Sequence, residues 1–155
     1  MSDPAVIHDT FVLERDYPKP PEAVFAVFAD PAKKRRWFVE GPDHDIQLFT
    51  LDFQVGGHER AAYIYTGNAP IKGMTLSTDT VFHDIVPGQR VVISSSMALN
   101  DKRISCALVT FELRPTATGT KLICTHQAVF FEGADGPEMR KGGWEALLDK
   151  LAANL

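Results

Sequence analysis

The chain has little cysteine and no long apolar run. Only two of its 155 residues are cysteines, and their spacing is not that of a paired-cysteine metal site. No stretch comes near the roughly 18 apolar residues that a membrane-spanning helix needs. The first fifteen residues include Asp3, His8, Asp9 and Glu14, so they lack the apolar region of a signal peptide. These absences predict a cytoplasmic protein that is not associated with a membrane.

Positive charge is sparse as well. The 16 lysines and arginines are outnumbered by 20 acidic residues, which gives a net charge of −4. The densest basic run, residues 33–36, is interpreted as a solvated helix face rather than a contact with nucleic acid. The sequence also lacks a phosphate-binding glycine loop and a Gly-x-Ser-x-Gly elbow. We therefore expect no nucleic-acid partner, no cofactor and no serine nucleophile.

What is present is a chain of one-domain length, 45% hydrophobic, with many strand-like segments. Turn-forming residues separate these segments, and two short helices follow the first of them. The predicted strands are 7–17, 47–55, 58–66, 72–86, 90–98, 103–115 and 119–131. The predicted helices are 21–28, 30–37 and 138–153. This order predicts an α+β fold in one domain, 1–155, with a curved antiparallel sheet of about seven strands packed on a long C-terminal helix.

The last two predicted strands, 103–115 and 119–131, allow a register to be proposed. Side chains alternate between the two faces of a strand, so one choice of pairing fixes every face. The pairs that this register places on one face are Leu113 with Leu122, Phe111 with Cys124 and Val109 with His126. Cys106 then lies on the opposite face from Cys124, which predicts two free thiols rather than a disulfide.

The predicted C-terminal helix has one apolar stripe at helical spacing. Its members are Trp144, Leu148, Leu151 and Leu155. Asp149 and Lys150 lie off this stripe. Gly142 and Gly143 come at the start of the helix, where the lack of a Cβ atom would permit a close approach to a strand or a positive φ. We therefore expect the helix to close over the sheet and to leave a pocket between them.

Short motifs spread over nearly the whole chain resemble a known family. In order they are Pro20–Phe25, Trp37, Asp52–Gly57, Pro87–Val92, Gly119–Leu122, and Gly143–Trp144 followed by Leu148 and Leu151. Their order and spacing are similar to those of the activator-of-heat-shock-protein-90-ATPase-like proteins, within the START/birch-pollen-allergen (SRPBCC) superfamily. The family's Leu-x-x-x-His pattern is kept as Leu122 and His126. In the hairpin, Gln54 stands where the family usually has arginine.

The resemblance implies a helix-grip fold with a deep cavity under the C-terminal helix. It also implies the binding or transformation of hydrophobic small molecules, because the superfamily includes lipid carriers, hormone receptors and aromatic polyketide cyclases. The family takes its name from co-chaperones that contact heat-shock protein 90 in the stress response, which makes a chaperone contact a further hypothesis.

Two titratable residues are the main candidates for chemistry. His126 faces the concave side by the register above, and it is either a ligand anchor or base, or a core histidine with all its hydrogen bonds made. Glu59 shares a strand face with Ala61 and Tyr63. It is either a general base or polar anchor with a raised pKa, or a residue exposed at the rim or paired with a neighbour such as Arg60.

The other histidines have less support. His83 lies in a run without clean alternation, so its direction is ambiguous. His58 is expected on a turn, and His8 and His44 are expected to be exposed. No two histidines have the helical spacing of metal ligands, so no metal site is expected.

The leading hypothesis is a binding protein, monomeric or homodimeric, for a hydrophobic or aromatic small molecule. The predicted polar anchors are His126, Glu59, Ser95 and Tyr63, and the predicted walls are Trp144, Trp37, Phe111 and Met97. The first alternative is a cyclase-like or hydrolase-like enzyme that uses His126 or Glu59 for proton transfer. The second is a co-chaperone-like module with an exposed apolar patch.

Overall fold

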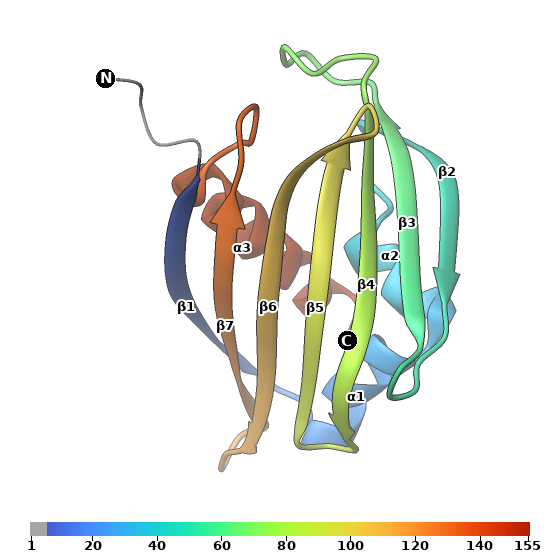
Figure 1. Cartoon of the computed structure of the whole chain (residues 1–155). Coiled ribbons are helices and arrows are strands. Elements are labelled where there is room, and N and C mark those ends of the chain that lie inside the picture. Colours follow the sequence, from blue (N-terminus) through green and yellow to red (C-terminus); the bar gives the residue numbers. More distant parts are fainter. Residues whose placement is uncertain (1–5) are drawn as a thin grey trace.

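A computed structural model describes residues 6–155. The elements are β1 (Ile7–Tyr17), α1 (Pro21–Ala29), α2 (Pro31–Phe38), β2 (His44–Leu51), β3 (His58–Tyr65), β4 (Thr75–Val86), β5 (Arg90–Leu99), β6 (Lys102–Pro115), β7 (Thr120–Phe130) and α3 (Pro137–Ala153). The seven strands form one antiparallel sheet in the order β1-β7-β6-β5-β4-β3-β2. The three helices lie on the same face of this curved sheet (Figure 1). The predicted helix-grip fold is confirmed.

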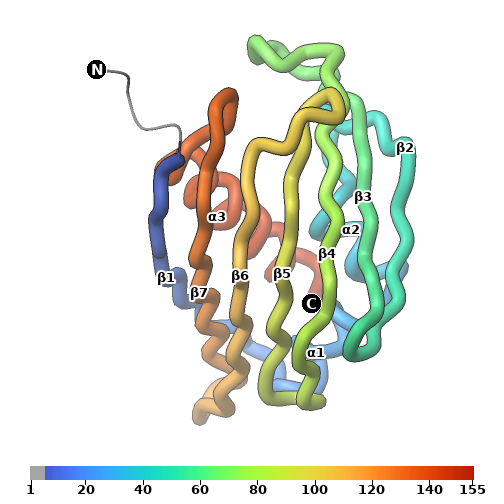
Figure 2. Tube along the Cα trace, in the orientation of Figure 1, coloured from blue at the N-terminus to red at the C-terminus, as the bar shows by residue number. Residues whose placement is uncertain are grey.

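Strands from the two ends of the chain lie side by side in the sheet. β1 forms one edge and pairs with β7, so that Leu13 lies opposite Cys124 (Figure 2). The other edge is β2, which pairs with β3. Because β1 pairs only with the last strand, the sheet is completed only when both ends of the described chain have come together.

The predicted register of β6 and β7 is confirmed. Phe111 lies opposite Cys124, and Val109 lies opposite His126. Cys106 is exposed and Cys124 is buried, and both are free thiols as expected.

The predicted bounds of β2 and β4 were wrong in detail, since β4 begins at Thr75 rather than at residue 72. β2 begins at His44 and ends at Leu51, because the chain turns through residues 52–57 and Asp52 N donates to His58 O. A Cβ atom on Gly57 would lie 2.2 Å from Asp52 O, so this turn requires glycine. In β4 the register shifts between Phe82 and Asp84, which is a β-bulge that breaks the alternation of side chains.

The core lies between the helices and one end of the sheet. A row of buried side chains crosses the strands from Leu13 through Cys124 and Phe111 to Val91. Phe28 of α1 packs on this row, with its ring centroid 5.0 Å from that of Phe111. Large side chains therefore fill the space between sheet and helices at this end.

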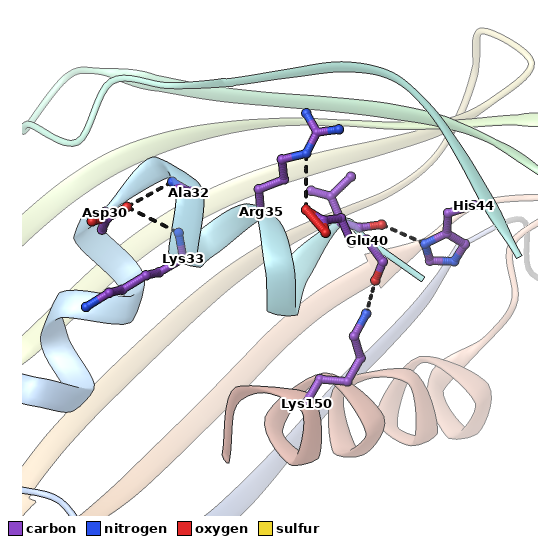
Figure 3. Close-up of polar contacts among 8 residues, drawn as sticks. Asp30, Ala32, Lys33, Arg35, Glu40, His44 and Lys150 are labelled. Carbon is purple, nitrogen blue, oxygen red and sulfur yellow. Dashed lines mark hydrogen bonds and ion pairs between the residues drawn. The ribbon is translucent and has the colours of Figure 1, made fainter. Parts of the chain in front are cut away.

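Helix α2 begins at a cap that the sequence predicts. The Asp30 carboxylate accepts hydrogen bonds from the backbone N–H groups of Ala32, at 2.9 Å, and Lys33, at 3.2 Å (Figure 3). Pro31 occupies the first turn, where its missing N–H group leaves no helical hydrogen bond unmade. This cap fixes the residue at which α2 begins.

Three of the four predicted members of the apolar stripe of α3 are confirmed, whereas Leu155 lies beyond the end of the helix at Ala153 and is half-buried. Trp144, Leu148 and Leu151 are buried against the sheet. The glycines of α3 have another role than expected. Gly142 and Gly143 lie inside the helix, without positive φ, and a Cβ atom on either would meet nothing within 4 Å. They do not mediate a close approach to a strand. Instead, they leave open space beside the helix.

Candidate functional site

A cavity of about 690 Å³ lies between α3 and the sheet. Its helical wall is a second stripe of α3, beside the stripe that enters the core. The members of this second stripe are Met139, Gly143, Ala146, Leu147 and Lys150. The loop between β3 and β4, which includes Ala69, Pro70 and Ile71, forms part of the lining at the other side.

The cavity exists because inward side chains become small toward the end of the sheet where β7 finishes. One row across the strands contains Ala107, Ser95 and Thr80. The next contains Ser105, Met97 and Thr78, followed by Ala61. Apart from Met97 these side chains are short, in contrast to the phenylalanines of the core, and Ser105 meets α3 through the long side chain of Arg140. The sheet and helix are held apart by the core, and the gap that remains at this end is not filled.

His126 is the most buried imidazole in the cavity wall, at 2% exposure. Its ring stacks on Phe11, with centroids 4.5 Å apart, and lies 6.2 Å from that of Trp144. Nδ1 is buried and has no hydrogen-bond partner among residues 6–155. Burial, and to a smaller extent the positive charge of Arg140, lowers the pKa of His126 to about 4. His126 is therefore neutral at pH 7.

We expect this lowered pKa to make the protein less stable in mild acid. The unfolded imidazole takes up a proton near pH 6.5, and the folded one only near pH 4. The stabilising effect is complete above pH 6.5 and is lost as the pH falls toward 4, at a cost of about 3 kcal/mol. Urea unfolding at pH 7 and pH 4 measures it. His126→Gln should lose less stability over this range, and an equal loss in both proteins would contradict the assignment.

Arg140 and Asp135 form a closed ion pair in the cavity wall. Arg140 donates to both oxygens of Asp135, at 2.8 Å and 2.7 Å, and to Ser105 Oγ at 2.9 Å. Its guanidinium lies 5.1 Å from the Phe130 ring centroid. This bidentate pair balances the charge of Arg140 within the protein.

Lys150 and His44 lie at another part of the cavity lining, where α3 meets the segment between α2 and β2. Lys150 Nζ donates to the backbone oxygen of Glu40, and His44 Nδ1 donates to that of Val39 at 2.7 Å (Figure 3). The His44 ring stacks on Tyr63 with centroids 3.8 Å apart. His44 was expected to be exposed, but it is half-buried in the cavity wall because β2 begins at this residue.

Five of the eight predicted site residues line the cavity: His126, Tyr63, Ser95, Met97 and Trp144. Burial raises the pKa of the Tyr63 phenol above its usual value. Ser95 Oγ accepts a hydrogen bond from Thr80 at 2.9 Å, so its own hydroxyl hydrogen is free to donate. Thr78, which was not predicted, adds a buried hydroxyl without a partner among residues 6–155.

Glu59 points inward, as its strand face predicted, but it does not line the cavity. It is 1% exposed, and Lys34 Nζ lies 2.9 Å from its Oε1. This is a close ion pair whose geometry falls short of a hydrogen bond. Two expectations are thereby corrected. The partner of Glu59 is Lys34 rather than Arg60, and residues 33–36 are not all solvated, because Lys34 is 4% exposed.

Trp37 and Phe111 also lie outside the cavity lining. Trp37 is fully buried, and its indole N–H donates to Val27 O at 2.8 Å, where α1 ends. Phe111 contacts Phe28 and Trp144 in the core. Both side chains determine how the helices sit on the sheet.

The remaining histidines lie away from the cavity. His83 is exposed at the β4 bulge, and its Nε2 lies 2.7 Å from Ser94 Oγ. His58 begins β3 rather than lying on a turn, and its Nδ1 is 2.9 Å from an Asp79 oxygen. His58 and Asp79 belong to an open depression of about 680 Å³ on the outer face of the sheet. Within residues 6–155, no group of three or more His, Cys, Asp or Glu residues could hold a metal ion.

Three charged lining residues were not predicted from the sequence: Arg140, Asp135 and Lys150. Arg140 lies four residues before Trp144 and continues the apolar stripe, which was a usable signal. Asp135 lies in an irregular segment and offered none. Lys150 was correctly placed off the apolar stripe that enters the core. It belongs to the second stripe of α3, which lines the cavity.

None of the helices in the described residues is both long enough and apolar enough to cross a membrane. A comparison with curated proteins gives no match. Proteins of known structure that are similar to this chain include two from Rhizobium species. One from Rhizobium loti is 44% identical, with a TM-score of 0.86 over 97% of this chain and 99% of its own. One from Rhizobium leguminosarum is 33% identical, with a TM-score of 0.89 over 96% and 95%.

A more distant structure shows the same fold. It is described as an AHSA1-like protein from Aeromonas hydrophila, and is 20% identical, with a TM-score of 0.67 over 94% of this chain and 91% of its own. The family model for activator of Hsp90 ATPase homolog 1-like proteins matches residues 18–155. The match starts at the end of β1 and includes both stripes of α3. The chain therefore belongs to the family of activator of Hsp90 ATPase homolog 1-like proteins, within the SRPBCC superfamily.

Proposed function

We propose that the protein binds a largely apolar small molecule in the cavity between α3 and the sheet. The observation that carries this proposal is a cavity of about 690 Å³ whose lining includes His126, a buried imidazole whose Nδ1 has no partner among the described residues. Pockets for small ligands usually measure about 300–1,000 Å³ and combine apolar walls with a few polar groups. The volume and lining of this cavity agree with that description.

His126 is the proposed polar anchor for the ligand. A neutral imidazole has one donor and one acceptor nitrogen, and a buried nitrogen without a partner costs about 1–3 kcal/mol. A ligand hydroxyl can donate or accept, so it would satisfy Nδ1 in either tautomer. Thr78 and Ser95 offer further hydroxyl groups in the same wall.

Two neighbouring glycines of α3 provide a matched test. Gly143 lines the cavity and Gly142 does not, and a Cβ atom on either would meet nothing within 4 Å. Gly143→Leu should fill the cavity and weaken binding of the uncharged dye Nile red at least about tenfold, measured by fluorescence titration. Gly142→Leu should bind as the wild type does. Equal affinity in both variants, or no saturable binding by the wild type, would contradict the proposal.

The enzymatic alternative receives less support from the same residues. A pKa of about 4 makes His126 a weak base at pH 7, and Glu59 is held by Lys34 away from the cavity. A chaperone contact is the second candidate function, because the family is named for activators of Hsp90 ATPase. Stimulation of the ATPase rate of a purified Hsp90 by this protein would support it, and an unchanged rate would count against it.

A further inference from the structure

The positive and negative charges of the side chains that line the cavity do not cancel. Three residues in the lining have charged side chains, namely Asp135, Arg140 and Lys150. The first two neutralise each other through two short hydrogen bonds. Lys150 therefore gives the cavity lining one uncompensated positive charge, although the chain as a whole is acidic.

Among residues 6–155, no carboxylate lies within 4.0 Å of Lys150 Nζ. Two acidic residues are close to it in sequence or space, and both have other partners. Glu40 is 3.2 Å from Arg35, and Asp149 is 3.4 Å from Arg15. Lys150 reaches only the backbone oxygen of Glu40 (Figure 3). An ammonium group can donate three hydrogen bonds, so two N–H donors of Lys150 remain available for a ligand.

Burial lowers the pKa of Lys150, although the charge of Glu40 opposes this shift. The charged ammonium group has thus lost part of its hydration. A negative group from a ligand would compensate that loss, because an opposite charge favours the ionised form.

The rest of the helical wall is suited to an elongated apolar body. Lys150 lies ten residues after Arg140 in α3, which corresponds to about 15 Å along the helix axis. Gly143, Ala146 and Leu147 lie between them and carry no charge or hydrogen-bonding side chain. The cavity thus has a cationic group at Lys150 and a neutral polar region around His126 and Ser105.

We propose that the ligand is an amphiphilic organic acid, whose carboxylate binds Lys150 Nζ while its apolar body lies along α3. This inference rests on the proposed function and specifies the chemical class of its ligand. The carboxylate accepts a charge-assisted hydrogen bond from the ammonium group, which is stronger than a bond between neutral groups. Uncharged molecules of the same shape lose that contact.

Matched pairs of acids and alcohols test the charge at this site. Decanoate and decanol form one pair, and naphthylacetate and naphthylethanol form the other, with displacement of Nile red as the readout. We expect the wild-type protein to bind each acid about tenfold more tightly than its alcohol at pH 7. Lys150→Met should abolish this preference, because it weakens the binding of each acid to the level of its alcohol. Lys150→Arg should retain it, and Lys141→Met, at an exposed site of α3 outside the cavity lining, should have no effect.

Three results would be distinguishable. Equal binding of acids and alcohols by the wild type overturns the inference but leaves the proposed function standing. A preference for acids that survives in Lys150→Met also overturns it. A failure of both the probes and Nile red to bind instead contradicts the proposed function itself.

Discussion

In the Lys34→Met variant we expect the free energy of unfolding to fall by about 3–5 kcal/mol. Glu59 would remain 1% exposed and lose the only cation near its carboxylate among the described residues. An uncompensated buried charge is far more costly than the intact pair. Lys34 also lies 4.6 Å from the ring centroid of Phe38 and 5.1 Å from that of Trp37, and these contacts would be lost as well. Urea unfolding monitored by tryptophan fluorescence measures the change.

A double-mutant cycle separates the ion pair from simple packing. Glu59→Leu alone should also destabilise the protein, because it leaves Lys34 buried without a partner. The double variant should recover most of the loss, since a buried ion pair can often be replaced by apolar residues at little cost. Arg36→Met is the control, because Arg36 is exposed in the same helix. Additive effects of the two substitutions would refute the coupling.

Trp37→Ala is the second variant with a large expected effect, again about 3–5 kcal/mol of unfolding free energy. Trp37 is fully buried, and its ring centroid lies 5.3 Å from that of Phe28. The substitution would leave a large void between α1 and α2. It would also leave Val27 O without the indole donor at the end of α1. Thermal unfolding and urea titration should both report the loss.

Ligand affinity distinguishes this structural role from a role in the cavity. Trp37 does not line the cavity, so Nile red affinity of the folded Trp37→Ala protein should be unchanged. Trp37→Phe retains an aromatic ring without the indole N–H group, and should lose less stability. If the fully folded Trp37→Phe protein bound Nile red more weakly than the wild type, Trp37 would have to contribute to the ligand site.

Much of the fold could be predicted because strand periodicity is local. Assigning Val109 opposite His126 required only the alternation of side chains and the length of one hairpin. The apolar stripe of Trp144, Leu148 and Leu151 likewise followed from helical spacing. The predicted bounds of elements needed small corrections where backbone hydrogen bonds end an element, as at the turn that follows Leu51 of β2.

The site was predicted less completely, because charge pairs join distant segments. Glu59 and Lys34 come from β3 and α2, and neither residue by itself indicates the other as its partner. Lys150 approaches the segment between α2 and β2 only after α3 has packed on the sheet. Such pairs depend on the relative position of elements, which the spacing of residues within one element does not contain.

By itself, the sequence determined the order of strands and helices, the inward face of β7 with His126, and the motifs that identify the family. Those features depend on periodicity and turn chemistry, which act over a few residues. Only the tertiary structure decided that Glu59 and Trp37 belong to the core, and that His126, Arg140 and Lys150 surround one cavity. The physical reason is packing. Large side chains at one end of the sheet hold α3 away from small ones at the other, and the space between them arises only when all these elements are in place.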